Sequence, residues 1–188
     1  ILIINHSFLR YVLMAFIPKG LSAYHPWPLL TQNDLPFNYY ISPVISLFLL
    51  GGIIYSLRKT RILVFGILFF ILNLLLVLQI IPVGVAVIAE RYSYISYLGL
   101  FFIVATLFVK IIDGKNTKQI FLKPVMLLLL IVFTSGFSFA TYQRVTVWQK
   151  DKNLWDDMIS NYPATAYIAY YNRAKYWNEN NNKKGAFE

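Results

Sequence analysis

The chain has 188 residues, of which 58% are hydrophobic and only 13% are charged, and its mean hydropathy is positive. This composition excludes an ordinary soluble domain and predicts a polytopic membrane protein. The formal net charge of +9 does not indicate nucleic-acid binding, because the basic residues form short clusters beside apolar runs, and the absence of cysteine excludes disulfides and thiolate metal sites.

The first segment of the chain is apolar but interrupted by polar residues. Residues 1–17 include Asn5, His6 and Arg10, and Pro18 stops a helix at the end of this run. We predict either the tail of a spanning helix or a helix that lies in the membrane interface. Arg10 is a candidate for contact with a phosphate group or with lipid headgroups. The chain starts without an initiating Met, and we expect it to be a fragment of a longer protein.

Residues 21–40 are rich in proline and aromatic residues, which favour a loop at the level of the lipid headgroups. His25 lies in this loop, and His6 is the only other histidine of the chain. Because the chain has no cysteine, a metal site would need carboxylates from elsewhere. We therefore interpret His25 as a surface or interface histidine and expect no metal and no cofactor.

Four apolar segments follow, and each is close to the ~20 residues that a helix needs to cross a bilayer. They are residues 41–57, 62–81, 95–109 with a backward extension to Tyr92, and 123–142. These segments predict an all-α fold. We expect a polytopic bundle of about four spanning helices with an N-terminal interfacial or partial helix, followed by a helical hairpin.

The links between the apolar segments indicate their orientation. Residues 58–61 carry three basic residues and no acid, and residues 110–123 carry four lysines against a single aspartate. By the positive-inside rule both links are cytoplasmic. The proline-rich loop, Glu90 with Arg91, and everything after Gln143 are then extracytoplasmic.

Glu90 and Arg91 are candidate site residues because they lie between two uncharged apolar runs. A charge in such sequence costs ~2.5–3.5 kcal/mol at a helix centre and usually survives only at an interface, in a pair or in a polar cavity. The planar fork of Arg91 suits a lipid phosphate, and Glu90 would hold a neighbouring base or polarise a hydroxyl. As alternatives, Arg91 reaches the headgroups and Glu90 caps the first turn of the next helix.

Charges of both signs appear in the last quarter of the chain, and the long apolar runs end. This change predicts a transmembrane region at residues 1–143 and an extracytoplasmic helical domain at residues 144–188. Within that domain, apolar residues at helical spacing predict an amphipathic helix at residues 147–161. A second helix is predicted from about residue 164 to residue 178.

The second of these helices has the spacing of a tetratricopeptide repeat. Tyr170 is followed four residues later by Ala174, then three later by Trp177 and nine later by Ala186. Small residues at two of these positions would let antiparallel helices approach closely. Because one repeat cannot bury its own face, we expect the array to continue. An ordinary amphipathic hairpin is the alternative.

Three parts of the chain resemble the transmembrane and tetratricopeptide-repeat O-mannosyltransferase family and its bacterial relatives in the GT-C class of glycosyltransferases. Residues 89–99 are similar to the Ala-Glu-Arg stretch of that family, although Ser96 and Tyr97 stand where the family tends to have Pro-Ser. The weaker matches are Arg10 with residues 16–24, and Arg144 with Trp148, Leu154 and Trp155.

The resemblance implies a membrane enzyme that moves a sugar from a polyprenyl-phosphate donor to a protein or glycan acceptor. Arg91, Glu90 and Arg10 would then contact the donor phosphate or the acceptor, and the repeats would bind the acceptor. In GT-C enzymes the catalytic aspartate lies in the first external loop, so we expect it upstream of Ile1 and no catalytic residue in this chain. The Asn- and Lys-rich tail and the short loops favour a bacterial inner membrane. The alternative function is a non-catalytic, membrane-anchored repeat scaffold.

Overall fold

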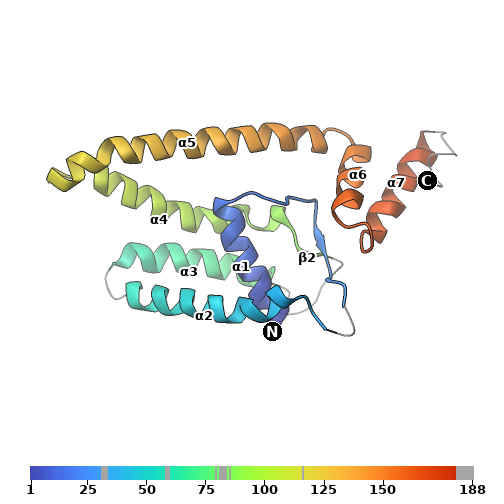
Figure 1. Ribbon diagram of the computed structural model, residues 1–188, viewed down its shortest axis with the longest axis horizontal. Helices are drawn as coiled ribbons and strands as arrows, with labels where there is room; N and C mark the ends of the chain where they lie inside the picture. The colour runs from blue at the N-terminus through green and yellow to red at the C-terminus, as the bar shows by residue number, and fades with distance from the viewer. Residues whose placement is uncertain are drawn as a thin grey trace.

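The computed structural model describes residues 1–30, 34–57, 60–78, 80, 84, 86–115 and 117–180, and in this part of the chain the fold is all-α, as predicted. The helices are α1 (Leu2–Phe16), α2 (Phe37–Leu57), α3 (Arg61–Leu75), α4 (Tyr94–Ile112), α5 (Thr117–Trp148), α6 (Asp151–Asn161) and α7 (Tyr167–Glu179). Figure 1 shows α2 to α5 along the long axis of the molecule, α1 crossing them, and α6 and α7 at one end.

Three helices among the described residues, α2, α4 and α5, are long and apolar enough to cross a membrane. Within the described residues, the predicted span at residues 62–81 is a helix only over α3, whose 15 residues measure about 22 Å, which is less than the ~30 Å hydrocarbon core. Thr60 starts α3 by accepting a hydrogen bond from the Leu63 N–H at 3.4 Å. The backbone leaves the helix at Leu76, in a turn that the Val77 N–H closes on the Leu74 carbonyl.

α3 and α4 pack with their backbones in close approach at Gly66 and Gly99. A Cβ atom at Gly66 would lie 2.7 Å from the carbonyl oxygen of Gly99, and a Cβ atom at Gly99 would collide with the Gly66 carbonyl. Only glycine therefore fits at this crossing, as is common where apolar helices pack in a membrane. Aromatic rings close the same interface, with Phe65 against Phe102 and Phe70 stacked on Tyr97.

α1 lies across the other helices instead of beside them. Along its length it contacts α2, then α3, then α4, through the pairs His6–Tyr39, Phe8–Phe70 and Phe16–Phe101. These contacts fall within ten helical residues, or about 15 Å of axis, so α1 passes over three helices in less than the thickness of a bilayer. At 15 residues α1 is also shorter than the helices of membrane-spanning length, and its position relative to the membrane stays a prediction.

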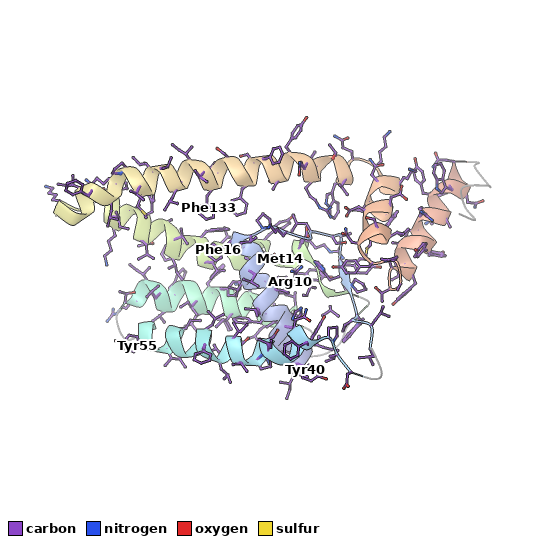
Figure 2. All side chains as sticks on the ribbon, in the orientation of Figure 1. Arg10, Met14, Phe16, Tyr40, Tyr55 and Phe133 are labelled. Atoms are coloured by element: carbon purple, nitrogen blue, oxygen red, sulfur yellow. The ribbon has the colours of Figure 1, made fainter. Side chains whose placement is uncertain are left out.

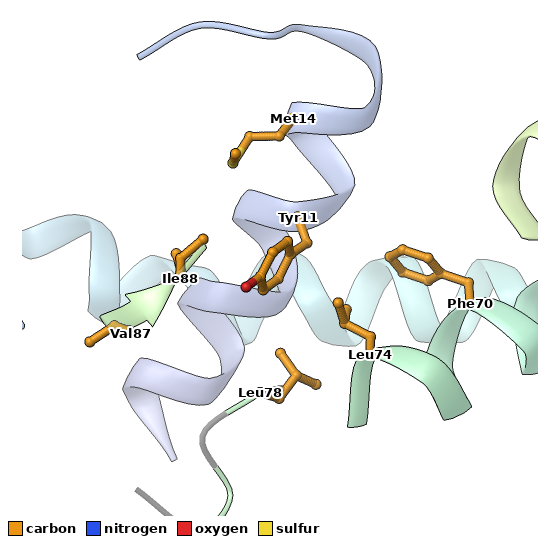
Figure 3. Packing of buried hydrophobic residues seen from close by; sticks show 7 residues of the cluster. All are labelled: Tyr11, Met14, Phe70, Leu74, Leu78, Val87 and Ile88. Atoms are coloured by element: carbon orange, nitrogen blue, oxygen red, sulfur yellow. The ribbon is translucent and has the colours of Figure 1, made fainter. Parts of the chain in front are cut away.

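Tyr11 is the centre of the core that joins α1 to α3 and to the segment before α4 (Figure 3). Its side chain is fully buried against Phe70, Leu74 and Ile88. The phenol accepts a hydrogen bond from the Ala89 N–H at 3.1 Å and donates one to the Ala89 carbonyl at 3.3 Å. One side chain thus satisfies both backbone groups of the residue that precedes Glu90.

A two-stranded antiparallel ribbon connects the proline-rich loop to the segment before α4. Strand β1 (His25–Pro26) pairs with β2 (Ala86–Ile88), His25 opposite Ile88. The sequence does not predict this ribbon, because the two strands are very short and some 60 residues apart. It forms the surface on which the C-terminal hairpin rests: Ala23, Tyr24, Ala86 and Ala89 share a core with Met158, Ala166 and Ala169.

α6 and α7 form the predicted hairpin with shifted ends. α5 continues through residue 148, so the predicted boundary between residues 143 and 144 falls inside one continuous helix. Of the repeat positions, Tyr170, Ala174 and Trp177 lie on α7, and Ala186 lies outside the described residues. The side chains of the first three are exposed or half-buried, and the tetratricopeptide assignment stays a prediction.

Candidate functional site

Glu90 and Arg91 line a cavity of about 480 Å³ between the start of α4 and the end of α5, which we call the amphiphilic cavity. Both residues belong to η1, a single 3₁₀ turn at Glu90–Tyr92. The polar lining residues are Glu90, Arg91, Ser93, Thr141, Arg144 and Gln149, and the apolar ones are Met14, Pro18, Leu21, Tyr94, Tyr97, Phe137, Ala140, Val145 and Trp148. The cavity therefore offers two arginines and one acid within apolar walls.

Glu90 accepts hydrogen bonds through both its side chain and its backbone carbonyl. Its half-buried carboxylate accepts a hydrogen bond from the Ser22 N–H, and its carbonyl accepts one from the Ser93 hydroxyl at 2.7 Å. Burial raises the pKa of Glu90, and the Ser22 N–H and the Arg144 guanidinium partly oppose this rise. Glu90 thus holds Ser22 against η1, and its carboxylate does not cap α4.

Arg91 has an exposed side chain whose guanidinium lies 5.2 Å from the centre of the Tyr92 ring. Among the described residues Arg91 forms no ion pair, not even with the adjacent Glu90. Its hydrogen-bond donors therefore remain available to a ligand in the amphiphilic cavity.

Arg144 is the site residue that sequence reasoning missed, because it entered only as part of a resemblance. Its side chain is 17% exposed, and Nη1 donates to the Asp157 carboxylate at 2.9 Å. Nε and Nη2 are buried and have no partner among the described residues. An unpaired buried donor costs about 1–3 kcal/mol, and more for a charged group, so this guanidinium is poised for a further acceptor. The one feature of the sequence that could have identified Arg144 is its position just after an apolar span.

An apolar groove of about 330 Å³ lies along α5 and adjoins the amphiphilic cavity. The two share Pro18 and Phe137. The remaining groove residues are Phe16, Ile17, Lys19, Val132, Phe133 and Gly136. Figure 2 labels two of them, Phe16 of α1 and Phe133 of α5. A cationic cavity that adjoins an apolar groove matches a molecule with an anionic head and an apolar tail.

Arg10, the third sequence candidate, lines a different cavity. This junction cavity of about 440 Å³ lies where α1, the proline-rich loop, the start of α2 and the α6–α7 link meet. It is lined by His6, Arg10, His25, Pro26, Trp27, Pro28, Leu29, Pro36, Asn38, Tyr39, Ile88, Tyr162 and Thr165. The structure therefore separates Arg10 from Glu90 and Arg91, which it brings together.

His25 is buried, and the interpretation as a surface or interface histidine is wrong in this respect. Its side chain is 7% exposed, and its Nδ1 forms a hydrogen bond with the Tyr162 hydroxyl of the α6–α7 link. Burial, the guanidinium groups of Arg10 and Arg144, and His6 lower the pKa of His25 to about 4. The imidazole is therefore neutral at pH 7. Within the described ranges, no three His, Asp or Glu side chains come together as a metal site.

Comparisons with protein-family models, curated proteins and solved structures find no match to this chain. The class of protein is therefore described from the fold and the cavities alone. Its described residues form an all-α fold with three helices of membrane-spanning length and composition, which is compatible with a membrane protein. At one end it carries a helical hairpin beside an arginine-lined cavity.

Proposed function

We propose that this chain is the membrane part and first repeat hairpin of a GT-C-type glycosyltransferase, which transfers a sugar from a polyprenyl-phosphate donor to a protein or glycan acceptor. The observation that carries the proposal is the amphiphilic cavity with its adjoining apolar groove. The phosphate would occupy the cavity, and the first isoprene units would occupy the groove.

The charges of the amphiphilic cavity support an anionic headgroup. The Glu90 carboxylate already accepts from the Ser22 N–H, and Asp157 is engaged by Arg144. The Arg91 guanidinium and the Nε and Nη2 donors of Arg144 remain for a ligand. Two guanidinium forks offer charge-assisted, bidentate hydrogen bonds that a phosphate accepts.

The arrangement of the helices supports an extracytoplasmic site. The end of α2, the start of α3, the end of α4 and the start of α5 lie at one end of the bundle, and the start of α4 and the hairpin lie at the other (Figure 1). The links that join α2 to α3 and α4 to α5 are basic in sequence. Applied to these ends, the positive-inside rule puts the cavity and the hairpin outside the cytoplasm. With the bacterial character of the tail, we assign the protein to a bacterial inner membrane with its repeats on the outer side.

The hairpin lies beside the cavity and supports a role of the repeats in holding the acceptor. Arg144, which lines the cavity, is paired with Asp157 of α6, so the hairpin and the site share one ion pair. A helical array that continues from α7 would present an extended partner close to the donor.

Polyprenyl-phosphate binding and sugar transfer by the full-length protein test the proposal. Arg91→Gln and Arg144→Gln should each weaken binding of polyprenyl phosphate in detergent micelles at least tenfold and reduce transfer in parallel. Lys175→Gln, on the exposed face of α7, is the matched control and should leave both unchanged. Normal binding by both arginine variants would reject the assignment and favour the membrane-anchored scaffold.

A further inference from the structure

We propose that the junction cavity is a second binding site, specific for an acidic sugar: a single sugar ring that carries a phosphate monoester or a carboxylate. The site stands apart from the amphiphilic cavity and the apolar groove, with which it shares no lining residue. Its volume of about 440 Å³ lies in the range usual for small-ligand pockets, ~300–1,000 Å³.

Arg10 supplies the charge that selects an anion. Its half-buried guanidinium has no hydrogen-bond or ion-pair partner among the described residues, and the lining of the cavity contains no Asp or Glu. A half-buried guanidinium without a carboxylate leaves several strong donors unused. A phosphate or carboxylate group fits this fork in a bidentate manner.

His25 is the second observation that points to a ligand. It is 93% buried, since 7% of its surface is exposed, and its Nε2 atom has no partner among the described residues. When the Tyr162 hydroxyl donates to Nδ1, the proton of the neutral ring is on Nε2, which becomes a donor. Arg10 and His25 come from two different elements and line the same cavity, and each would offer a donor to an oxyanion bound there.

The rest of the lining suits a sugar ring better than a bare ion. The half-buried indole of Trp27, between Pro26 and Pro28, forms an apolar wall for the C–H face of a ring. Asn38 and Thr165 add an amide and a hydroxyl that can bind ring hydroxyls. Apolar walls with a few polar groups are typical of small-molecule sites.

The ligand would bridge the two parts of the molecule. Arg10 comes from α1, whereas Tyr162 and Thr165 come from the link between α6 and α7. Occupation of the cavity would therefore fasten the hairpin to α1 and to the proline-rich loop. Ligand that binds only this closed arrangement raises its stability by mass action.

Calorimetric titration of the full-length protein in detergent tests the inference with four probes: glucose 6-phosphate, glucuronate, glucose and inorganic phosphate. Both acidic sugars should bind at least tenfold more tightly than glucose and than inorganic phosphate. Trp27→Ala should reduce glucose 6-phosphate binding to the level of inorganic phosphate. Equal affinity for glucose 6-phosphate and inorganic phosphate, or no binding of either acidic sugar, would overturn the acidic-sugar site.

The two arginine cavities provide reciprocal controls. Arg10→Gln should weaken glucose 6-phosphate at least tenfold and leave polyprenyl phosphate unchanged, and Arg91→Gln should do the reverse. His25→Asn provides a second variant, and unfolding curves of each variant establish that it is folded. Acidic-sugar binding that survives both Arg10→Gln and His25→Asn contradicts the site. A loss of polyprenyl-phosphate binding without a loss of acidic-sugar binding would contradict only the proposed glycosyltransferase function and would leave the acidic-sugar site in place.

Discussion

Tyr11 shows how one hydroxyl positions the candidate site. Its phenol holds both backbone groups of Ala89, and the next two residues are Glu90 and Arg91. The Tyr97 hydroxyl donates in turn to the Tyr11 carbonyl at 2.9 Å, which ties α4 to α1 at the same point. The direction of Arg91 therefore depends on a buried contact between residues 78 positions apart.

Tyr11→Phe should remove this support and leave the Ala89 N–H buried without its partner, whereas the Ala89 carbonyl keeps the hydrogen bond from the Tyr92 N–H. We expect a loss of about 1–3 kcal/mol in the free energy of unfolding and weaker binding of polyprenyl phosphate. Thermal unfolding and lipid binding of the full-length protein measure the two effects. Tyr171→Phe, on an exposed part of α7, is the control. A variant as stable as the control would show that η1 is held by other contacts.

His25 makes the docking of the hairpin dependent on pH. Its folded-state pKa of about 4 lies below the ordinary value of 6.5, so the unfolded chain takes up the proton first as the pH falls. The stabilisation is complete above pH 6.5, is lost between pH 6.5 and 4, and amounts to about 3 kcal/mol. The charges that oppose protonation are Arg10, Arg144 and His6, and Tyr162 is the hydrogen-bond partner.

Limited proteolysis of the hairpin from pH 7.5 to pH 4 measures this dependence. Cleavage should accelerate below pH 6.5 in the unmodified protein, whereas His25→Gln should flatten this part of the profile. Comparison of the two chains removes the contribution of the carboxylates, which titrate in both. Parallel profiles would exclude His25 as the titrating group.

At the scale of elements, α5 forms one wall of the apolar groove, and Gly136 provides a way to fill that groove. Among the described residues, no atom outside the helix backbone lies within 4 Å of a Cβ atom built at Gly136, so a side chain is tolerated there. Gly136→Phe should block the groove and weaken long-chain polyprenyl phosphate at least tenfold, but spare a short-chain analogue. Gly51→Phe on α2, with equally open surroundings, is the matched control. Equal losses for both chain lengths would place the lipid tail elsewhere.

Local sequence features predict most of the elements. Apolar runs predict α2, α4 and α5, because ~20 uncharged apolar residues have few alternatives to a helix. The same signal overestimates α3, since hydropathy does not register that the chain turns at Leu76. The ribbon escapes prediction because β1 and β2 are formed by contacts distant in sequence, not by periodicity.

The candidate site is only half predictable for the same reason. Glu90 and Arg91 attract notice as charges between apolar runs, which is a local signal. Arg144 acquires its role only when α6 brings Asp157 to it and η1 brings Glu90 nearby. Arg10 belongs to another cavity because α1 crosses the bundle, a direction that the composition of residues 1–17 does not determine.

At the scale of the whole molecule, the orientation proposed here follows from which end of the bundle carries the basic links. Single cysteines test it directly, because the chain has none of its own. Lys115→Cys should react with a membrane-impermeant maleimide only after permeabilisation, and Lys150→Cys should react in intact cells. Both positions are exposed. The opposite labelling pattern would invert the proposed topology.

The length of α5 sets the height of the hairpin. Its 32 residues form a rod of about 48 Å, some 18 Å longer than the ~30 Å hydrocarbon layer. Because α6 follows after only two residues, the hairpin is attached to a rigid helix and not to a flexible linker. In the proposed enzyme α5 would fix the distance between the hairpin and the membrane. Sugar would then be added to acceptor positions at a set distance above the lipid surface, whatever their neighbouring sequence.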